Sequence, residues 1–271
     1  MRNELMQVHA VDVPGGRLAY RMAGADDAPV VLLIHAFASQ SLTWLPVAQA
    51  LVAAGFRVIA PDLPGHGRSS RWPHYALAVF DDALAALAEQ RLPSRFDMVG
   101  HSLGGHLALR FAARWPDRVR RLVVEAAPVP PQDEADALAM RREAGRPSLL
   151  QSARRLGLGR LLRLSLLRAF DVRAAKPVLA ELRQPMPGWW RDISRLHHAA
   201  LVLSSADDGL VSARAERLAA AMPHATLVRL GQGHHLHTRH GEAFLGAVLP
   251  FLSACDHDAL VPPRVATTSE A

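Results

Sequence analysis

Two patterns of apolar residues alternate along the chain and predict strands and helices in turn. Short runs rich in apolar residues, typical of buried strands, are followed by segments in which apolar residues recur at helical spacing. The predicted strands are 29–34, 56–60, 96–99, 119–124, 199–203 and 226–230. The predicted helices are 44–54, 75–90, 103–115, 212–222 and 242–252. Before them, the alternating stretches 6–13 and 17–22 flank Pro14-Gly15-Gly16 and predict an antiparallel hairpin.

A hairpin followed by alternating strands and helices predicts an α/β fold. The strands should form a mostly parallel sheet with helices on both faces. In such sheets, ligands bind beyond the carboxyl ends of the strands. Residues capable of chemistry follow directly after predicted strands: His35, Asp62, Ser102, Glu125, Asp208 and His234. We therefore expect a functional site at this edge of the sheet.

The segment Gly100-x-Ser102-x-Gly104 lies between a predicted strand and a predicted helix. This is the context that the nucleophile-elbow pattern G-x-S-x-G requires. The turn is so tight that the serine takes a strained backbone conformation, and the residues two before and two after it must be small. The strain presents the hydroxyl at the end of the sheet. The amides of the following helix then point to where negative charge develops during acyl transfer.

The segment from about residue 127 to residue 195 interrupts the alternation. It is rich in proline near its start, has several short amphipathic patches and contains no convincing strand. We expect a core formed by residues 1–127 and 196–255, a helical cap or lid at 128–195 inserted after the sixth strand, and a loosely ordered tail at 256–271. The alternative is a long crossover that only covers a sheet edge. Four lid candidates suggest a substrate with an apolar acyl or aromatic group, unless they are packing residues: Phe170, Met186, Trp189 and Trp190.

Composition narrows the class of protein. The chain has 271 residues, of which 50% are hydrophobic and 21% charged, as expected for one large globular domain. The single cysteine, Cys255, excludes an internal disulfide and suggests a reducing compartment. Residues 1–13 lack the apolar core of a signal peptide, and no apolar run reaches the roughly 20 residues that span a bilayer. We therefore expect a cytoplasmic protein that does not bind membranes.

The net charge is +6, and many arginines fall between residues 141 and 195. No nucleic-acid-binding motif accompanies this charge, so solvated helix faces explain it more simply. We expect a small molecule as the substrate and no nucleic acid partner, and a homo-oligomer stays open. An interaction protein that used the arginine-rich segment would bind in a strongly salt-dependent manner.

The chain resembles the α/β-hydrolase superfamily from about residue 8 to residue 252. The resemblance depends on several segments in a fixed order: 33–37 (LIHAF), 60–69 (APDLPGHGRS), the elbow around Ser102, 201–203 with Asp207-Asp208, and Gly233-His234. It implies an eight-stranded, mostly parallel sheet and a catalytic triad in the order Ser, Asp or Glu, His.

The resemblance also implies a role for each of these residues. Ser102 corresponds to the nucleophile and His234 to the general base, with Asp208 holding the imidazole tautomer. The backbone N–H groups of Leu103 and Phe37 correspond to the oxyanion hole, which stabilises the negative charge of the transition state.

Three positions depart from the family pattern or leave it open. The oxyanion loop usually reads His-Gly, and here Ala36 adds a methyl group that can narrow the hole. Asp208 is preferred over its neighbour Asp207 as the acid, and Glu125 is the alternative because some family members carry the acid after the preceding strand. The histidine loop holds further histidines, of which His237 is expected to be a pocket wall or a partner for the lid.

A cluster of histidines also raises the question of a metal site. Four of them lie close together in sequence: His234, His235, His237 and His240. No matching carboxylate or thiolate group completes a ligand set, so we expect neither a metal nor a cofactor. His35, His101 and His106 are expected to pack around the site, and Asp62 to brace its loop by hydrogen bonds.

A serine, a carboxylate and a histidine in this order predict nucleophilic attack on an electrophilic carbon, followed by hydrolysis. A serine at position 102 argues against dehalogenase and epoxide-hydrolase chemistry, which in this superfamily uses a carboxylate nucleophile. We therefore expect an esterase-like hydrolase acting on a carboxylic ester, lactone or thioester. The same triad also serves carbon–carbon bond hydrolysis, and the fold also hosts ligand-binding members without activity.

Overall fold

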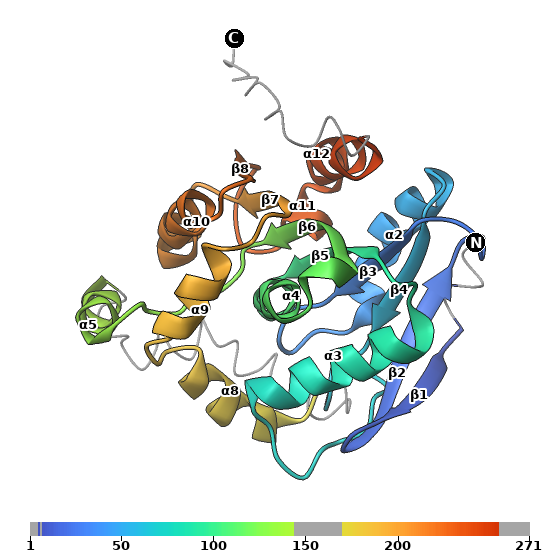
Figure 1. Cartoon of the computed structure of the whole chain (residues 1–271), viewed down its shortest axis with the longest axis horizontal. Helices are drawn as coiled ribbons and strands as arrows, with labels where there is room; N and C mark the ends of the chain where they lie inside the picture. The colour runs from blue at the N-terminus through green and yellow to red at the C-terminus, as the bar shows by residue number, and fades with distance from the viewer. Residues whose placement is uncertain (1–4, 6, 144–169, 255–271) are drawn as a thin grey trace.

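An eight-stranded sheet runs through the centre of the molecule, in the order β1-β2-β4-β3-β5-β6-β7-β8 (Figure 1). The structure, a computed structural model, describes residues 5, 7–143 and 170–254. β1 and β2 form the predicted hairpin, β2 pairs antiparallel with β4, and every other pair is parallel. The strands are β1 (His9–Val13), β2 (Gly16–Ala23), β3 (Val30–Ile34), β4 (Arg57–Pro61), β5 (Phe96–His101), β6 (Val119–Glu125), β7 (Ala199–Ser204) and β8 (Ala225–Arg229). The predicted fold class is confirmed.

Helices cover both faces of this sheet (Figure 1). One face carries α3 (Leu77–Arg91), α4 (Leu103–Arg114) and α10 (Gly209–Ala221). The other face carries α2 (Leu45–Ala53), α11 (Leu236–Arg239) and α12 (Gly241–Ser253). Across the described part of the chain, no helix combines the length and the apolar character that a membrane crossing requires.

The central strand β3 shows how the sequence produces this layered arrangement. All five of its residues are buried, and successive side chains enter opposite cores. Leu32 and Ile34 pack in the core that contains α3 and α4, whereas Val31 and Leu33 pack in the core that contains α2 and α12. A strand with helices on both faces needs apolar residues at every position, which explains the continuous apolar run.

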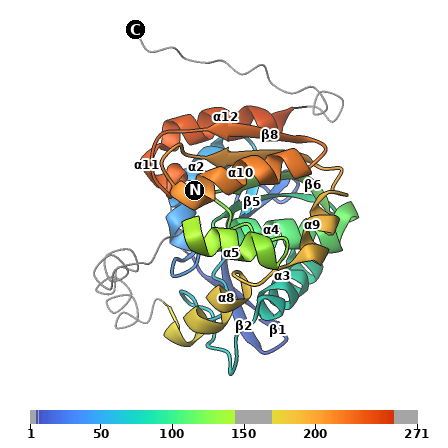
Figure 2. The same cartoon turned by 90° about the vertical axis from the view of Figure 1, so that its left-hand side faces the viewer.

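The segment between β6 and β7 is helical in its described part. It contains α5 (Glu134–Glu143), the short 3-10 helix η3 (Val172–Ala174), α8 (Ala175–Glu181) and α9 (Pro187–Ile193). These elements lie on the left of Figure 1, the side that faces the viewer in Figure 2. Residues 144–169 of the predicted cap lie outside the described residues, as do Cys255 and the predicted tail at 256–271.

The return of this segment to the core is anchored on the loop that follows β4. The backbone N–H of Asp171 donates to the carbonyl of Gly65 at 2.8 Å, and its carboxylate accepts from the Tyr75 hydroxyl at 2.8 Å. The same carboxylate pairs with Arg173 at 2.7 Å. Burial would raise the pKa of Asp171, but hydrogen bonds from Arg173 and Tyr75 outweigh it and lower the pKa to about 2. Asp171 is therefore ionised and holds the two segments together.

The aromatic lid candidates pack in the interior. Phe170, Trp189 and Trp190 are all buried. The indole N–H of Trp190 donates to the Pro130 carbonyl at 3.0 Å, and Trp189 stacks on His106 with ring centroids 5.5 Å apart. These are the contacts of packing residues. A lid placed over the site stays a prediction.

The helices of the core differ from the predictions most at α10 and at α11. α10 begins at Gly209, whereas the periodicity predicts a start at residue 212. α11 lies inside the histidine loop and was not predicted, because four residues are too few to show helical periodicity.

Candidate active site

Ser102 occupies the sharp turn between β5 and α4. Its backbone has φ 51° and ψ −118°, a conformation that costs energy for a residue with a side chain. The strain is held in place by the backbone N–H of Ser102, which donates to the carbonyl of Glu125 at 2.8 Å. The serine is partly exposed at the carboxyl end of the sheet. The structure therefore contains the predicted elbow.

The two glycines of the elbow are required by close backbone contacts. A Cβ at Gly100 would lie 2.3 Å from the carbonyl oxygen of Gly104. A Cβ at Gly104 would lie 2.1 Å from the carbonyl oxygen of Ile34 and 2.7 Å from that of His35. Any side chain at Gly104 would push α4 away from the end of β3. The first turn of α4 thus lies against the loop that follows β3.

His234 and Asp208 are in direct contact. Nδ1 of His234 lies 2.6 Å from Oδ2 of Asp208, and both side chains are partly exposed. Asp208 follows β7 and His234 follows β8, so the parallel pairing of these strands brings the two residues to one edge of the sheet. A proton on Nδ1 that is shared with the carboxylate leaves the lone pair of Nε2 free to accept a proton.

Asp207, the neighbouring carboxylate, makes a different contact. Its Oδ1 accepts a hydrogen bond from the backbone N–H of Gly233 at 2.7 Å. This hydrogen bond lowers the pKa of Asp207. The two adjacent aspartates therefore divide their contacts, since Asp207 holds the backbone of the histidine loop and Asp208 holds the ring of His234.

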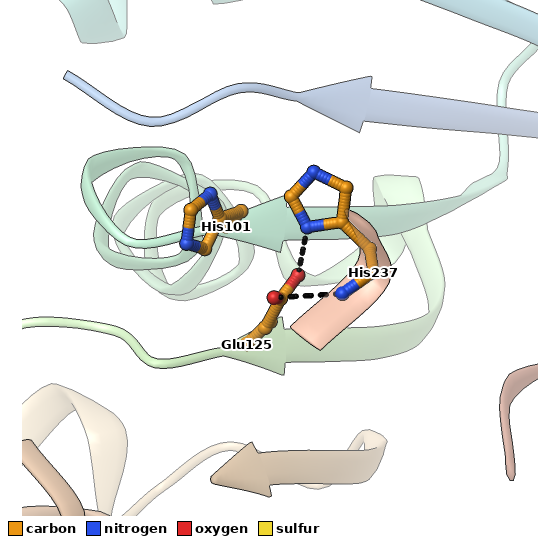
Figure 3. Close-up of side chains that lie close together, drawn as sticks. All are labelled: His101, Glu125 and His237. Atoms are coloured by element: carbon orange, nitrogen blue, oxygen red, sulfur yellow. Dashed lines mark hydrogen bonds and ion pairs between the residues drawn. The ribbon is translucent and has the colours of Figure 1, made fainter. Parts of the chain in front are cut away.

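Glu125, the alternative acid, is paired with His237 and not with His234. Its side chain is fully buried, and Oε2 accepts from Nδ1 of His237 at 2.7 Å (Figure 3). Its Oε1 accepts the backbone N–H groups of Leu236 and His237 at 2.6 and 3.1 Å. His237 also stacks on Trp44, with ring centroids 4.2 Å apart. His237 is thus buried on Glu125 and Trp44. Its expected role as a pocket wall or as a partner for the lid stays a prediction, since residues 144–169 of the predicted cap lie outside the described residues.

His101 contacts both the backbone and the ring of His234. Nε2 of His101 donates to the backbone carbonyl of His234 at 2.8 Å, and the two ring centroids are 5.1 Å apart. Burial lowers the pKa of His101 to about 3, so its ring is neutral. The residue directly before the serine thus holds the backbone of the predicted base.

The loop after β3 contains the second predicted oxyanion donor, Phe37. His66 accepts the N–H of Ala38 on Nε2 at 3.2 Å, and Ala38 has a positive φ of 53°. His35 accepts the N–H of Leu63 on Nε2 at 2.9 Å. These two bonds tie the loop to the segment after β4.

Within the described residues, neither predicted oxyanion donor has a backbone or side-chain acceptor. The N–H of Phe37 forms no hydrogen bond within the described residues. The N–H of Leu103 lies in the first turn of α4, where a helix offers no acceptor. Both groups are therefore available to a ligand, and their joint action on an oxyanion stays a prediction.

The structure contains the contact between Asp208 and His234, the predicted acid and base. Within the described residues, it does not contain a hydrogen bond between the hydroxyl of Ser102, the predicted nucleophile, and His234. Catalytic hydrogen bonds in ligand-free enzymes are often long and tighten only when substrate binds. The structure thus provides an imidazole oriented by a carboxylate and a strained serine at the same edge of the sheet.

His101, Glu125 and His237 form a compact buried cluster (Figure 3). Their potential ligand atoms lie within 4.8 Å of one another. Nδ1 of His237 and Oε2 of Glu125 are 2.7 Å apart, which is a hydrogen-bond distance and too short for two neighbouring ligands of one Zn²⁺ at about 2.0–2.2 Å each. The donor set fits a proton between these atoms better than a metal ion.

A pocket of about 490 Å³ opens on the surface between α3, α4 and α9. Its walls include Asp81, Arg110, Met186 and Trp189. Asp81 and Arg110 form an ion pair in this wall. None of the predicted catalytic residues lines this pocket, so it is separate from the elbow.

Comparison with known proteins agrees with the fold. A family model described as the alpha/beta hydrolase fold matches residues 29–195. An uncharacterized protein of Mycobacterium tuberculosis is 41% identical over 116 residues, 42% of this chain and 33% of that protein. The chain thus matches about a third of that relative's length.

Two further relatives have named activities. A haloalkane dehalogenase of Bradyrhizobium diazoefficiens is 30% identical over 298 residues, covering 93% of this chain and 96% of that protein. A pimeloyl-[acyl-carrier protein] methyl ester esterase of Nitrosomonas europaea is 38% identical over 99 residues, 36% of this chain and 37% of that protein.

Solved structures show the same architecture. A hydrolase from Pseudomonas aeruginosa superposes with a TM-score of 0.75 at 27% identity, covering 92% of this chain and 99% of that chain. An enol-lactonase from Burkholderia xenovorans has a TM-score of 0.68 at 23% identity, covering 91% of this chain and 100% of that chain. At 23% identity the likeness concerns the fold alone. The chain belongs to the alpha/beta hydrolase fold family.

Proposed function

We propose that the protein is a serine hydrolase that cleaves a carboxylic ester, lactone or thioester of a small apolar substrate. The observation that carries this proposal is the 2.6 Å contact between His234 and Asp208 at the edge where the elbow presents Ser102. A carboxylate, an oriented imidazole and a strained hydroxyl are the three groups that acyl transfer requires.

The reaction proceeds in two halves. Nε2 of His234 takes the proton of the Ser102 hydroxyl while the oxygen attacks the carbonyl carbon, and Asp208 stabilises the imidazolium that forms. The N–H groups of Leu103 and Phe37 stabilise the oxyanion. The leaving alcohol or thiol takes the proton from His234, which leaves an acyl group on Ser102. Water then repeats the sequence and releases the acid.

The relatives support a hydrolase and leave two bond types to be compared. The Nitrosomonas relative is a methyl ester esterase and one structural neighbour is an enol-lactonase, whereas the Bradyrhizobium relative is a haloalkane dehalogenase. Dehalogenases of this superfamily attack with a carboxylate, and position 102 carries a hydroxyl. This residue favours acyl transfer over halide displacement.

Labelling of Ser102 by a fluorophosphonate probe tests the proposal. We expect native protein to be labelled at Ser102, and Ser102→Ala to lose labelling and more than about 1,000-fold of its turnover of an activated ester. Native protein that is not labelled would favour a ligand-binding protein and overturn the proposal.

A substrate panel then separates the bond types. Chromogenic esters of increasing acyl length, a thioester, a lactone and a 1-haloalkane are compared, with acid release and halide release measured separately. We expect acid release that requires Ser102. Halide release that survives Ser102→Ala would show a different nucleophile.

A further inference from the structure

Glu125 contacts both segments that carry the predicted nucleophile and base. Its backbone carbonyl accepts the N–H of Ser102 at 2.8 Å. Its carboxylate accepts the N–H groups of Leu236 and His237 and the ring Nδ1–H of His237, all between 2.6 and 3.1 Å. These two residues begin α11, two and three positions after His234. One residue at the end of β6 therefore connects the elbow to the histidine loop.

The Glu125 carboxylate is buried and accepts three hydrogen bonds. Burial by itself would raise the pKa of Glu125, but the ring and backbone donors of His237 outweigh it and the pKa is lowered. Hydrogen bonds to a charged acceptor are stronger than those between neutral groups. The first residues of α11 are thus held more firmly than a neutral acceptor would hold them.

A second connection runs parallel to the first. His101 lies directly opposite Glu125 in the pairing of β5 with β6 and donates to the carbonyl of His234 at 2.8 Å. The backbone of the loop is thus held before α11 by His101. At the start of α11 it is held by Glu125, whose contacts with His237 are drawn in Figure 3. Both residues lie at the carboxyl ends of central strands, His101 in β5 and Glu125 in β6.

His237 extends the network toward the oxyanion loop. Its Nε2 lies 3.2 Å from the hydroxyl of Thr43, and its ring stacks on Trp44. Both residues belong to η1 (Ser41–Trp44), which follows the loop that contains Phe37. The Glu125–His237 pair therefore contacts the elbow, the histidine loop and the short helix that follows the Phe37 loop.

We propose that Glu125, acting through His237, is a positioning residue that sets the placement of His234 relative to Ser102. This inference rests on the proposed function and adds a role for a residue that does not touch the reacting atoms. A displacement of about 1 Å between reacting groups can lower a rate by about 100-fold, so a fixed loop has a direct effect on catalysis.

A pair of substitutions at His237 separates the hydrogen bond from the packing. Asparagine places an N–H at the position of Nδ1, so His237→Asn keeps the donor to Glu125 and loses the stacked ring. Phenylalanine keeps the ring on Trp44 and loses the donor, so His237→Phe leaves the Glu125 carboxylate without one partner. Glu125→Gln keeps the backbone contacts and removes the charge.

The measurement is the rate constant for fluorophosphonate labelling of Ser102 against pH, together with kcat and KM for an activated ester. We expect His237→Phe and Glu125→Gln to lower the plateau of labelling and kcat by about tenfold or more, with KM nearly unchanged, and His237→Asn to stay within about threefold of the native rate. The midpoint of the pH profile should not move, since Asp208 still holds His234. Melting temperatures and circular dichroism report the folded fraction of each variant.

The possible results distinguish failure of the proposed function from failure of the positioning role. Native protein that is not labelled overturns this inference together with the proposed function. Native protein that is labelled, with His237→Phe and Glu125→Gln reacting at its rate once corrected for the folded fraction, overturns the positioning role alone. A loss in His237→Asn with full retention in His237→Phe would show that ring packing matters and would also overturn it.

Discussion

In the proposed reaction, Asp208 is the residue that orients the base, because its carboxylate contacts the ring of His234. Two adjacent carboxylates compete for this role in the sequence, and the structure gives the ring to Asp208 and the Gly233 N–H to Asp207. The first contact orients the proton-accepting ring, and the second holds only the backbone. Loss of either carboxylate should therefore affect activity very differently.

Asp208→Asn should lower kcat for an activated ester by about 1,000-fold or more, because the amide favours the wrong imidazole tautomer. Asp207→Asn is the matched control, since its amide oxygen can still accept the Gly233 N–H, and it should lower kcat by less than about tenfold. Steady-state kinetics on the two variants measure the difference. Equal losses would contradict the assignment of Asp208 as the acid.

At the scale of elements, the junction of β3 and α4 determines the geometry of the elbow. Gly104 lets the first turn of α4 lie against the carbonyls of Ile34 and His35. The helix and the oxyanion loop are thus brought together by the absence of a single side chain. A glycine elsewhere in a helix, such as Gly246 in α12, has no neighbour within 4 Å of an added Cβ.

Gly104→Ala should lower the free energy of unfolding by about 1–3 kcal/mol, because the methyl group must displace backbone atoms. Gly246→Ala should raise it by about 0.5–1 kcal/mol, since alanine favours the helix and meets no obstacle. Urea unfolding followed by circular dichroism measures both. A neutral or stabilising Gly104→Ala would show that the junction is looser than the structure indicates.

Most of the strands and helices, and the elbow between β5 and α4, could be predicted from the sequence. The run at 29–34 is apolar at every position because β3 is buried on both faces, and the elbow glycines mark positions where only a hydrogen fits. α11 escapes prediction because four residues are too few to show helical periodicity, and its first two residues are held by the Glu125 carboxylate from a distant strand. Long-range hydrogen bonds of this kind leave no spacing in the sequence.

The same limit applies to the candidate site. Ser102 is predicted by the elbow motif, and Asp208 and His234 are implied by the resemblance to the α/β-hydrolase superfamily. The partnership of Glu125 with His237 joins residues 112 positions apart and has no local signal. The sequence shows His237 three positions after the predicted base, but nothing in the sequence indicates that its ring is buried against Trp44.

The whole molecule carries several buried histidines that are neutral in the folded state. Burial lowers the pKa of His66, His101 and His106 to about 3 in each case. In the unfolded chain these groups would have a pKa of about 6.5. Between these values the unfolded chain binds more protons than the folded one, so acid favours unfolding. The contribution of these three neutral histidines to the free energy of unfolding is fully present above about pH 6.5, and it is lost as the pH falls toward 3.

The free energy of unfolding should therefore fall as the pH drops from 7 to 5, by up to about 1.4 kcal/mol per pH unit for each of the three histidines. His106→Asn should reduce this slope by up to the same amount, since it removes one of the groups. Urea unfolding at a series of pH values measures both slopes. A free energy that does not change over this range would show that these rings are not buried as neutral groups.

The crowding around the Glu125 side chain limits how this scaffold can be redesigned. An engineer who removed Asp208 and recruited Glu125 to serve His234 would have to take the carboxylate away from three N–H donors that it already satisfies. His237 and the start of α11 would then lack an acceptor inside a dry core. Moving the acid from Asp208 to Glu125 thus requires several substitutions made together. No single substitution converts a protein with its acid after β7 into one with its acid after β6.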